Sequence, residues 1–290
     1  MSDLRIYSSD LMSRCPRQRQ LYREGKYEAI AYGALYRGLI AGQAIEDWLT
    51  DPNSPTDLVS LVHVAQDNVN QKLEEEGRVL SDAMRPREIA LEVIEMMGYF
   101  CARWDEWMIA QDIEIIGAEI PVRWGKVNWE FNSHMDLLCR RRGTDHYVII
   151  DWKWTKESPT AIYAKKHLQL RSYRTATLCG EVCINGFWTS LNAESVECFI
   201  GWLPGLLPYR RRTTVKDMVY MKGDLRPMEK FMVPTKIEKN YSDDDLVVHS
   251  QITQRASMLE QEYAPEIPTP EGCAACQSSA WCIDTTGDDQ

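Results

Sequence analysis

The sequence lacks any long hydrophobic run, because no stretch approaches the ~20 consecutive apolar residues that a membrane-spanning helix requires. Its N-terminus, MSDLRIYSSDLMSRC, also lacks the apolar core of a secretory signal. We therefore expect a cytoplasmic protein with no membrane partner. In that reducing compartment its nine cysteines are expected to be thiols or metal ligands, which makes disulfides an unexpected use of them.

Internal repeats, low-complexity tracts and a G-x-x-x-x-G-K-[ST] phosphate loop are also missing, so the chain has no recognisable ATPase of its own. Positive charge is in deficit, with 33 Lys and Arg against 43 Asp and Glu and a formal net charge of -10. This balance excludes a protein that coats nucleic acid through bulk electrostatics, so any polyanion must be handled locally. The 290 residues, 44% of them hydrophobic, suffice for a sizeable globular core.

Hydrophobic spacing divides the chain into helical and strand-like parts. Helices are expected at 8–24 and 34–50, and residues 55–112 form a helical insert with a break near Pro86. The period then changes to two in IEIIGAEIPVRW, VNWEFNSHMDLLCR and HYVIIDWKW, which predicts three consecutive strands, the last two forming a hairpin. Further expected elements are a helix at 160–178, strands at 196–203, 213–222 and 230–237, and a helix near 243–263.

The predicted hairpin brings two acids face to face. If its turn centres on Gly143 and Thr144, positions whose numbers sum to 287 lie opposite each other, which pairs Asp136 with Asp151. Their Cβ atoms would be ~5 Å apart. Two facing carboxylates repel each other unless a divalent cation lies between them. Lys153 emerges on the same face as Asp151, since strand side chains alternate.

Two acids and an ammonium on one face suit phosphodiester hydrolysis. A hard cation on the carboxylates can polarise a phosphate, and the lysine can orient water or neutralise developing charge. The plainer alternative is that Asp151 and Lys153 form a solvated ion pair at an exposed strand end. Gln169 and Tyr173, four apart, share a helical face suited to a backbone phosphate or a stacked base.

These groups occur in a fixed order that resembles the RecB-like branch of the PD-(D/E)xK nuclease superfamily. The resemblance implies an α/β fold, with a restriction-endonuclease-like core whose central mixed sheet is flanked by helices. It also implies a single nuclease domain over residues 1–290 that carries the insert at 55–112. The motifs that carry the resemblance are GQAIE at 42–46, HMD at 134–136, DWK at 151–153 and QLRSY at 169–173.

The resemblance also implies roles for individual residues. Glu46, Asp136 and Asp151 would bind Mg2+ or Mn2+, and Lys153 would be the catalytic lysine. Glu46 stands where the family usually has histidine; a glutamate can ligate a hard cation, or it can be an ordinary surface acid. The remaining implied site is a DNA-holding helix that carries Gln169 and Tyr173.

Three C-terminal cysteines, Cys273, Cys276 and Cys282, form a C-x2-C-x5-C pattern that lacks one ligand of a tetrahedral site. Cys15, in SRCPRQRQLY, resembles the early cysteine of iron-sulfur RecB-like nucleases, including AddB-type and CRISPR-associated relatives. The resemblance implies a cluster region made of residue 15 plus 264–290. Four thiolates suit either [4Fe-4S] or zinc, and the preference for iron comes from the resemblance.

The expected function is therefore that of a metal-dependent DNA nuclease, an exonuclease on single-stranded DNA or DNA ends, with a structural [4Fe-4S] cluster. Repair, recombination, phage DNA metabolism and CRISPR adaptation are the settings that the resemblance implies, with a helicase, recombination or CRISPR-adaptation protein as partner. Two alternatives stay open. One is a DNA-binding or assembly subunit that has lost turnover, and the other is a structural zinc protein of unrelated function.

Overall fold

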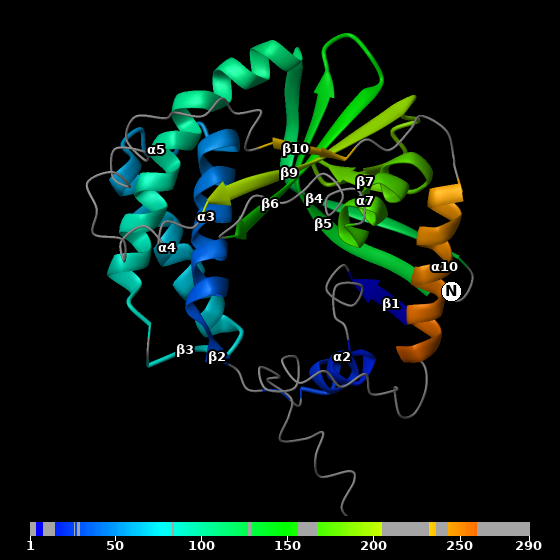
Figure 1. Cartoon of the computed structure of the whole chain (residues 1–290), viewed down its shortest axis with the longest axis horizontal. Coiled ribbons are helices and arrows are strands. Elements are labelled where there is room, and N and C mark those ends of the chain that lie inside the picture. Colours follow the sequence, from blue (N-terminus) through cyan, green and yellow to red (C-terminus); the bar gives the residue numbers. More distant parts are fainter. Residues whose placement is uncertain are drawn as a thin grey trace, which may run out of the picture.

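A mixed sheet lies between two groups of helices (Figure 1). The computed structural model describes residues 4–7, 15–25, 27, 30–82, 84–126, 129–155, 167–204, 232–235 and 243–259. None of the helices within these ranges is long and apolar enough to cross a membrane.

The main sheet has eight strands in the order β10-β9-β6-β5-β4-β7-β8, with β1 also paired to β5. The β6–β9 and β1–β5 pairs are parallel and the other pairs are antiparallel, so the expected mixed sheet is confirmed. The strands are β1 (Leu4–Tyr7), β4 (Ile113–Lys126), β5 (Trp129–Arg141), β6 (His146–Thr155), β7 (Glu181–Ile184), β8 (Phe187–Thr189), β9 (Ser195–Pro204) and β10 (Met232–Thr235). A separate parallel pair joins β2 (Ile30–Ala31) to β3 (Val79–Leu80).

Each face of the sheet has its own hydrophobic core. Strand alternation divides neighbouring residues between them, since Leu137 and Ile150 belong to one core and Leu138 and Ile149 to the other. The first core is shared with α3 (Gly33–Thr50), α4 (Leu58–Glu75) and α5 (Pro86–Gln111). The second is shared with α7 (Leu168–Cys179) and α10 (Asp243–Leu259), whereas α2 (Pro16–Arg23) contacts α10.

Most elements predicted from the sequence are present. The expected helices of 55–112 are α4 and α5, with β3 between them and Pro86 in the first turn of α5. The N-terminal helix begins at Pro16, with Cys15 as its N-cap, and residues 8–14 and the predicted strand at 213–222 lie outside the described residues. The β7–β8 hairpin was not predicted, although its Asn185-Gly186 turn, with φ of 51° and 83°, is a frequent hairpin connection.

Strand β5 shares one edge between two partners. Its other edge pairs with β4 along nearly its whole length. On the shared edge β1 pairs with 129–132 and β6 pairs with 137–140, so the strand is uncovered by either at 133–136. The sheet forks at this gap, and Asp136 lies at its rim. There the Trp152 N–H donates a hydrogen bond to Asp136 Oδ2, at 2.7 Å.

An internal ion pair fixes α3 beside the fork. Arg37 Nε on α3 lies 2.7 Å from Glu92 Oε2 on α5, and the two side chains are only 9% and 1% exposed. The Arg37 guanidinium also lies over the Trp154 ring of β6, 5.5 Å from its centroid. These contacts position the later turns of α3, which carry Glu46.

Candidate active site

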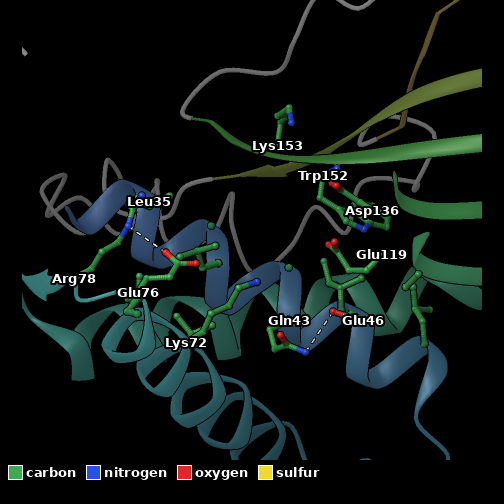
Figure 2. Close-up of a pocket in the computed structure, with 18 residues that line it drawn as sticks. Leu35, Gln43, Glu46, Lys72, Glu76, Arg78, Glu119, Asp136, Trp152 and Lys153 are labelled. Carbon is green, nitrogen blue, oxygen red and sulfur yellow. Dashed lines mark hydrogen bonds and ion pairs between the residues drawn. The ribbon is translucent and has the colours of Figure 1, made fainter. Parts of the chain in front are cut away.

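The fork in the sheet and α3 enclose a pocket of about 680 Å³. Glu46 from α3, Asp136 from β5 and Lys153 from β6 line it, as Figure 2 shows. The predicted hairpin register is confirmed by the pairs Leu137–Ile150 and Leu138–Ile149, whose numbers sum to 287. Asp136 and Asp151 are the next positions outward, where the Asp136 side chain accepts the N–H of Trp152.

Asp151 and Lys153 form an ion pair inside the protein. Asp151 is fully buried, and its Oδ2 lies 2.7 Å from Lys153 Nζ. Neither oxygen of Asp151 accepts a well-aligned hydrogen bond from a described residue, so the contact is electrostatic in character. Lys153 is 27% exposed and is among the residues that line the pocket, but its ammonium points away from Glu46, Glu119 and Asp136 and contacts Asp151 (Figure 2).

The α7 helix continues this arrangement. Lys153 Nζ donates a hydrogen bond to Gln169 Oε1 at 3.1 Å, and Gln169 Nε2 donates to the Tyr173 hydroxyl at 2.7 Å. The Ser133 hydroxyl lies 3.3 Å from that of Tyr173. The polar network therefore runs from the carboxylate of Asp151 through the lysine to the interior of α7.

Tyr173 was expected to contact DNA, but its side chain is buried. It is 1% exposed, so its ring is inaccessible to a base. Burial raises the pKa of Tyr173 above its ordinary range, and the charges of Asp151 and Asp136 add to the effect. The hydroxyl stays protonated and fixes Gln169, which in turn orients Lys153. In this structure Tyr173 contacts Gln169 and Ser133, and the expected contact with DNA stays a prediction.

Burial and neighbouring negative charge disfavour ionisation of Glu46 and Asp136 in the pocket. Burial raises the pKa of Glu46 to about 7, with further upward contributions from the charges of Glu119 and Asp47. Burial also raises the pKa of Asp136 well above its usual range, and the nearby Asp151 adds to this. Crowded carboxylates with raised pKa values are stabilised as anions when a cation is bound among them.

Glu119 completes this acidic group and was missed from the sequence. It follows a register shift between Ile115 and Gly117 in β4, and its φ of 46° lies in the left-handed region. Figure 2 shows its carboxylate between those of Asp136 and Glu46. Loss of water contacts raises its pKa, although the side chain as a whole remains open to solvent through the pocket. The signal in the sequence was G-A-E-I-P, since glycine and proline inside a strand mark an irregularity.

The oxygen donors fit a hard divalent cation in their chemistry. As they stand, no three His, Cys, Asp or Glu side chains of the described residues are grouped as a metal site. Of the expected trio, Glu46 and Asp136 share the pocket with Glu119, whereas Asp151 faces Lys153. The pocket therefore places oxygen ligands from Glu46, Glu119 and Asp136 around one space, and Asp151 is not among the residues that line it.

Two glycines of α3, Gly38 and Gly42, also line the pocket. A Cβ added to either one would meet nothing within 4 Å, and neither has a positive φ. Glycine in a helix interior costs about 1 kcal/mol relative to alanine. Neither the packing nor the backbone of α3 therefore requires glycine at these positions.

Of the four cysteines expected to bind a cluster, only Cys15 lies among the described residues. Cys15 is half-buried at the N-cap of α2. Cys273, Cys276 and Cys282 lie outside the described residues.

A forked mixed sheet thus carries a carboxylate-lined pocket with a lysine on the neighbouring strand, an arrangement suited to phosphodiester hydrolysis. The chain belongs to the PD-(D/E)XK nuclease superfamily, whose family profile matches residues 8–283. No curated protein sequence matches it.

Two solved structures match the chain along most of its length. One is a protein from Eubacterium rectale described as "Putative exonuclease", with a TM-score of 0.55 and 11% identity, covering 97% of this chain and 92% of that one. Another is the crystal structure of SSO0001, with a TM-score of 0.39 and 14% identity, covering 98% of this chain and 88% of that one.

Proposed function

We propose that this protein is a metal-dependent DNA nuclease that removes nucleotides from single-stranded DNA or from free DNA ends. One observation carries the proposal: the acidic pocket opens directly beside a lysine whose position is fixed by Asp151 and Gln169. Membership of the nuclease superfamily supports the reaction class. The exonuclease description of the similar Eubacterium rectale protein supports action at ends.

Glu46, Asp136 and Asp151 are the proposed ligands of Mg2+ or Mn2+, and Glu119 is a fourth candidate because it lies in the same pocket. When bound, the ion supplies neutralisation of phosphate charge and activation of the attacking water. The carboxylates also repel a phosphate that arrives without a cation. Substrate and ion are therefore expected to depend on each other for binding.

Lys153 is the proposed catalytic lysine. Asp151 lies against its ammonium and the Gln169 carbonyl oxygen accepts a hydrogen bond from it, so the group is positioned before substrate arrives. The ammonium can then stabilise negative charge that develops on the phosphate oxygens. Gln169 is only half-buried, so we propose that it approaches the DNA backbone.

We further propose that Cys15, Cys273, Cys276 and Cys282 bind a [4Fe-4S] cluster, with zinc as the alternative. The family match spans all four positions. Such a site would tie α2 to the C-terminal segment and close a loop of more than 250 residues, worth on the order of 5 kcal/mol in chain entropy. Anaerobic purification followed by iron, sulfide and zinc analysis distinguishes the two. Zinc without iron would remove the cluster and leave the nuclease proposal intact.

The activity is tested with labelled single-stranded and double-stranded DNA, free-ended or end-blocked, in Mg2+, Mn2+ or chelator. We expect metal-dependent release of nucleotides from free ends, and its loss in Lys153→Ala and Asp151→Asn. Arg87→Ala is the matched control, since Arg87 is exposed on α5 and is not among the residues lining the pocket. DNA binding without cleavage by the unaltered protein would favour the non-catalytic subunit instead.

A further inference from the structure

The pocket continues beyond the acidic group, along α3 toward α4. At this far end it is lined by Lys72, Leu73, Glu76 and Arg78. Its volume of about 680 Å³ is of the size that accommodates an organic ligand and far exceeds the space that metal ions need. The part that the proposed reaction leaves unexplained is therefore a basic extension next to the carboxylates.

In this extension, Lys72 is the residue best placed to bind a ligand. Figure 2 shows it reaching from α4 into the pocket, between Arg78 on one side and Glu46 on the other. Its charge lowers the pKa of both Glu46 and Glu119, so it lies in their neighbourhood. No carboxylate of a described residue comes within the 4 Å of an ion pair with its ammonium.

The other cations of the pocket are already engaged. Lys153 is paired with Asp151. Arg78 is paired with Glu76 and donates a hydrogen bond to the Tyr22 hydroxyl of α2. Lys72 is thus the cation whose exposed ammonium is directed into the pocket without such a partner among the described residues.

Gly38 and Gly42 of α3, one helical turn apart, line the same pocket as Lys72. Alanine would fit at both positions and would favour the helix. A glycine face allows a ligand's backbone to lie directly against the helix. Lys72 and this face line the same pocket.

We propose that Lys72 and the Gly38–Gly42 face bind the backbone phosphate of a nucleotide next to the scissile bond. A flexible ammonium acts as a point charge for phosphate, and such contacts fix register without reading sequence. The subsite offsets the repulsion that the adjacent carboxylates exert on a polyanion. This inference rests on the proposed nuclease function and adds to it the residue that sets the position of the strand.

The test is a double-substitution cycle that changes Lys72 in the protein and one phosphate linkage in the DNA. Single-stranded oligonucleotides carrying one uncharged methylphosphonate linkage, placed in turn at each position near the free end, are bound to the full chain by fluorescence anisotropy. Lys153→Ala is the background, so that binding is measured without cleavage. At one position the neutral linkage should weaken binding about tenfold when Lys72 is present and have no effect in Lys72→Ala. Lys72→Ala should also flatten the dependence of log K on log salt by about 0.7.

Arg87→Ala is the charge-matched control, and it should leave the effect of every linkage unchanged. Gly38→Ala and Gly42→Ala should weaken binding while raising the Tm by about 2–4 °C, opposite signs that a structural role would not produce. Gly98→Ala in α5 should raise the Tm and leave binding unchanged, since its Cβ would make an ordinary 3.8 Å contact with Leu58.

The outcomes separate this subsite from the function on which it rests. If the neutral linkage weakens binding equally with and without Lys72, and the unaltered protein binds and cleaves DNA, the subsite alone is overturned. Unchanged affinity in both glycine variants would do the same. Failure of the unaltered chain to bind or cleave DNA would overturn the nuclease proposal and the subsite with it.

Discussion

Ionisation of Glu46 should make the metal-free protein less stable as the pH rises. The pKa of Glu46 is about 7 in the folded protein, against an ordinary value of 4.5. Between these values the folded state keeps a proton that the unfolded state has released, so the free energy of unfolding falls with increasing pH. Below pH 4.5 the cost is absent, and above pH 7 it is fully present.

The size of the effect follows from the same values. The interval between 4.5 and about 7 corresponds to about 3.4 kcal/mol at full strength. Glu46 is only half-buried, and screening by solvent reduces this to about 1–2 kcal/mol. Glu46→Gln keeps the shape of the side chain and removes the charge. It should therefore raise the unfolding free energy by about 1–2 kcal/mol at pH 8, or roughly 2–6 °C in Tm.

Thermal unfolding of chelator-treated protein between pH 4 and pH 8.5 measures this difference. The gain from Glu46→Gln should vanish at pH 4, and Glu74→Gln on the exposed side of α4 should show no such trend. Added Mn2+ at pH 8 should stabilise the unaltered protein more than the variant, because the ion relieves the same repulsion. A Glu46→Gln protein that melts at or below the unaltered one at pH 8 would refute the reasoning.

Three further changes test the supports of the site. Tyr173→Phe removes the hydroxyl that accepts a hydrogen bond from Gln169, the partner of the proposed catalytic lysine, so kcat should fall about tenfold with KM and Tm nearly unchanged. Arg37→Ala leaves Glu92 buried without its partner and should cost about 3–5 kcal/mol in urea unfolding, most of which Arg37→Met with Glu92→Leu should restore. Gly201→Ala places a Cβ 2.0 Å from the Trp152 ring, so the displaced ring should lower both Tm and cleavage rate, with equal Tm values contradicting the contact.

The parts of the fold that the sequence predicted are those with local signals. The β5–β6 register followed from alternation and from the turn at Gly143, which has a φ of 69°. The strands that were missed are short. β1 has four residues and pairs with a segment far along the chain, and β7 and β8 have four and three residues. Such lengths are too brief to establish a period of two.

The same distinction holds for the site. Asp136, Asp151 and Lys153 belong to one hairpin whose register was predicted, but the ladder ends at Leu137–Ile150 and does not include the expected facing pair of Asp136 and Asp151. Asp136 lines the pocket, whereas Asp151 contacts Lys153. Glu119 reaches the pocket because β4 is irregular, and Lys72 reaches it because the insert packs against α3. Neither position has a local pattern that reports where its strand or helix docks. Tertiary packing decided both.

The pairing of β1 with β5 has a consequence for how the protein is made. Leu4 leaves the ribosome well before its partner Trp129, which follows about 125 residues later. During that interval the first strand has no neighbour to satisfy its backbone groups, so the nascent chain carries an unpaired strand through much of its synthesis. The core beneath Ile6 can close only after β5 is complete.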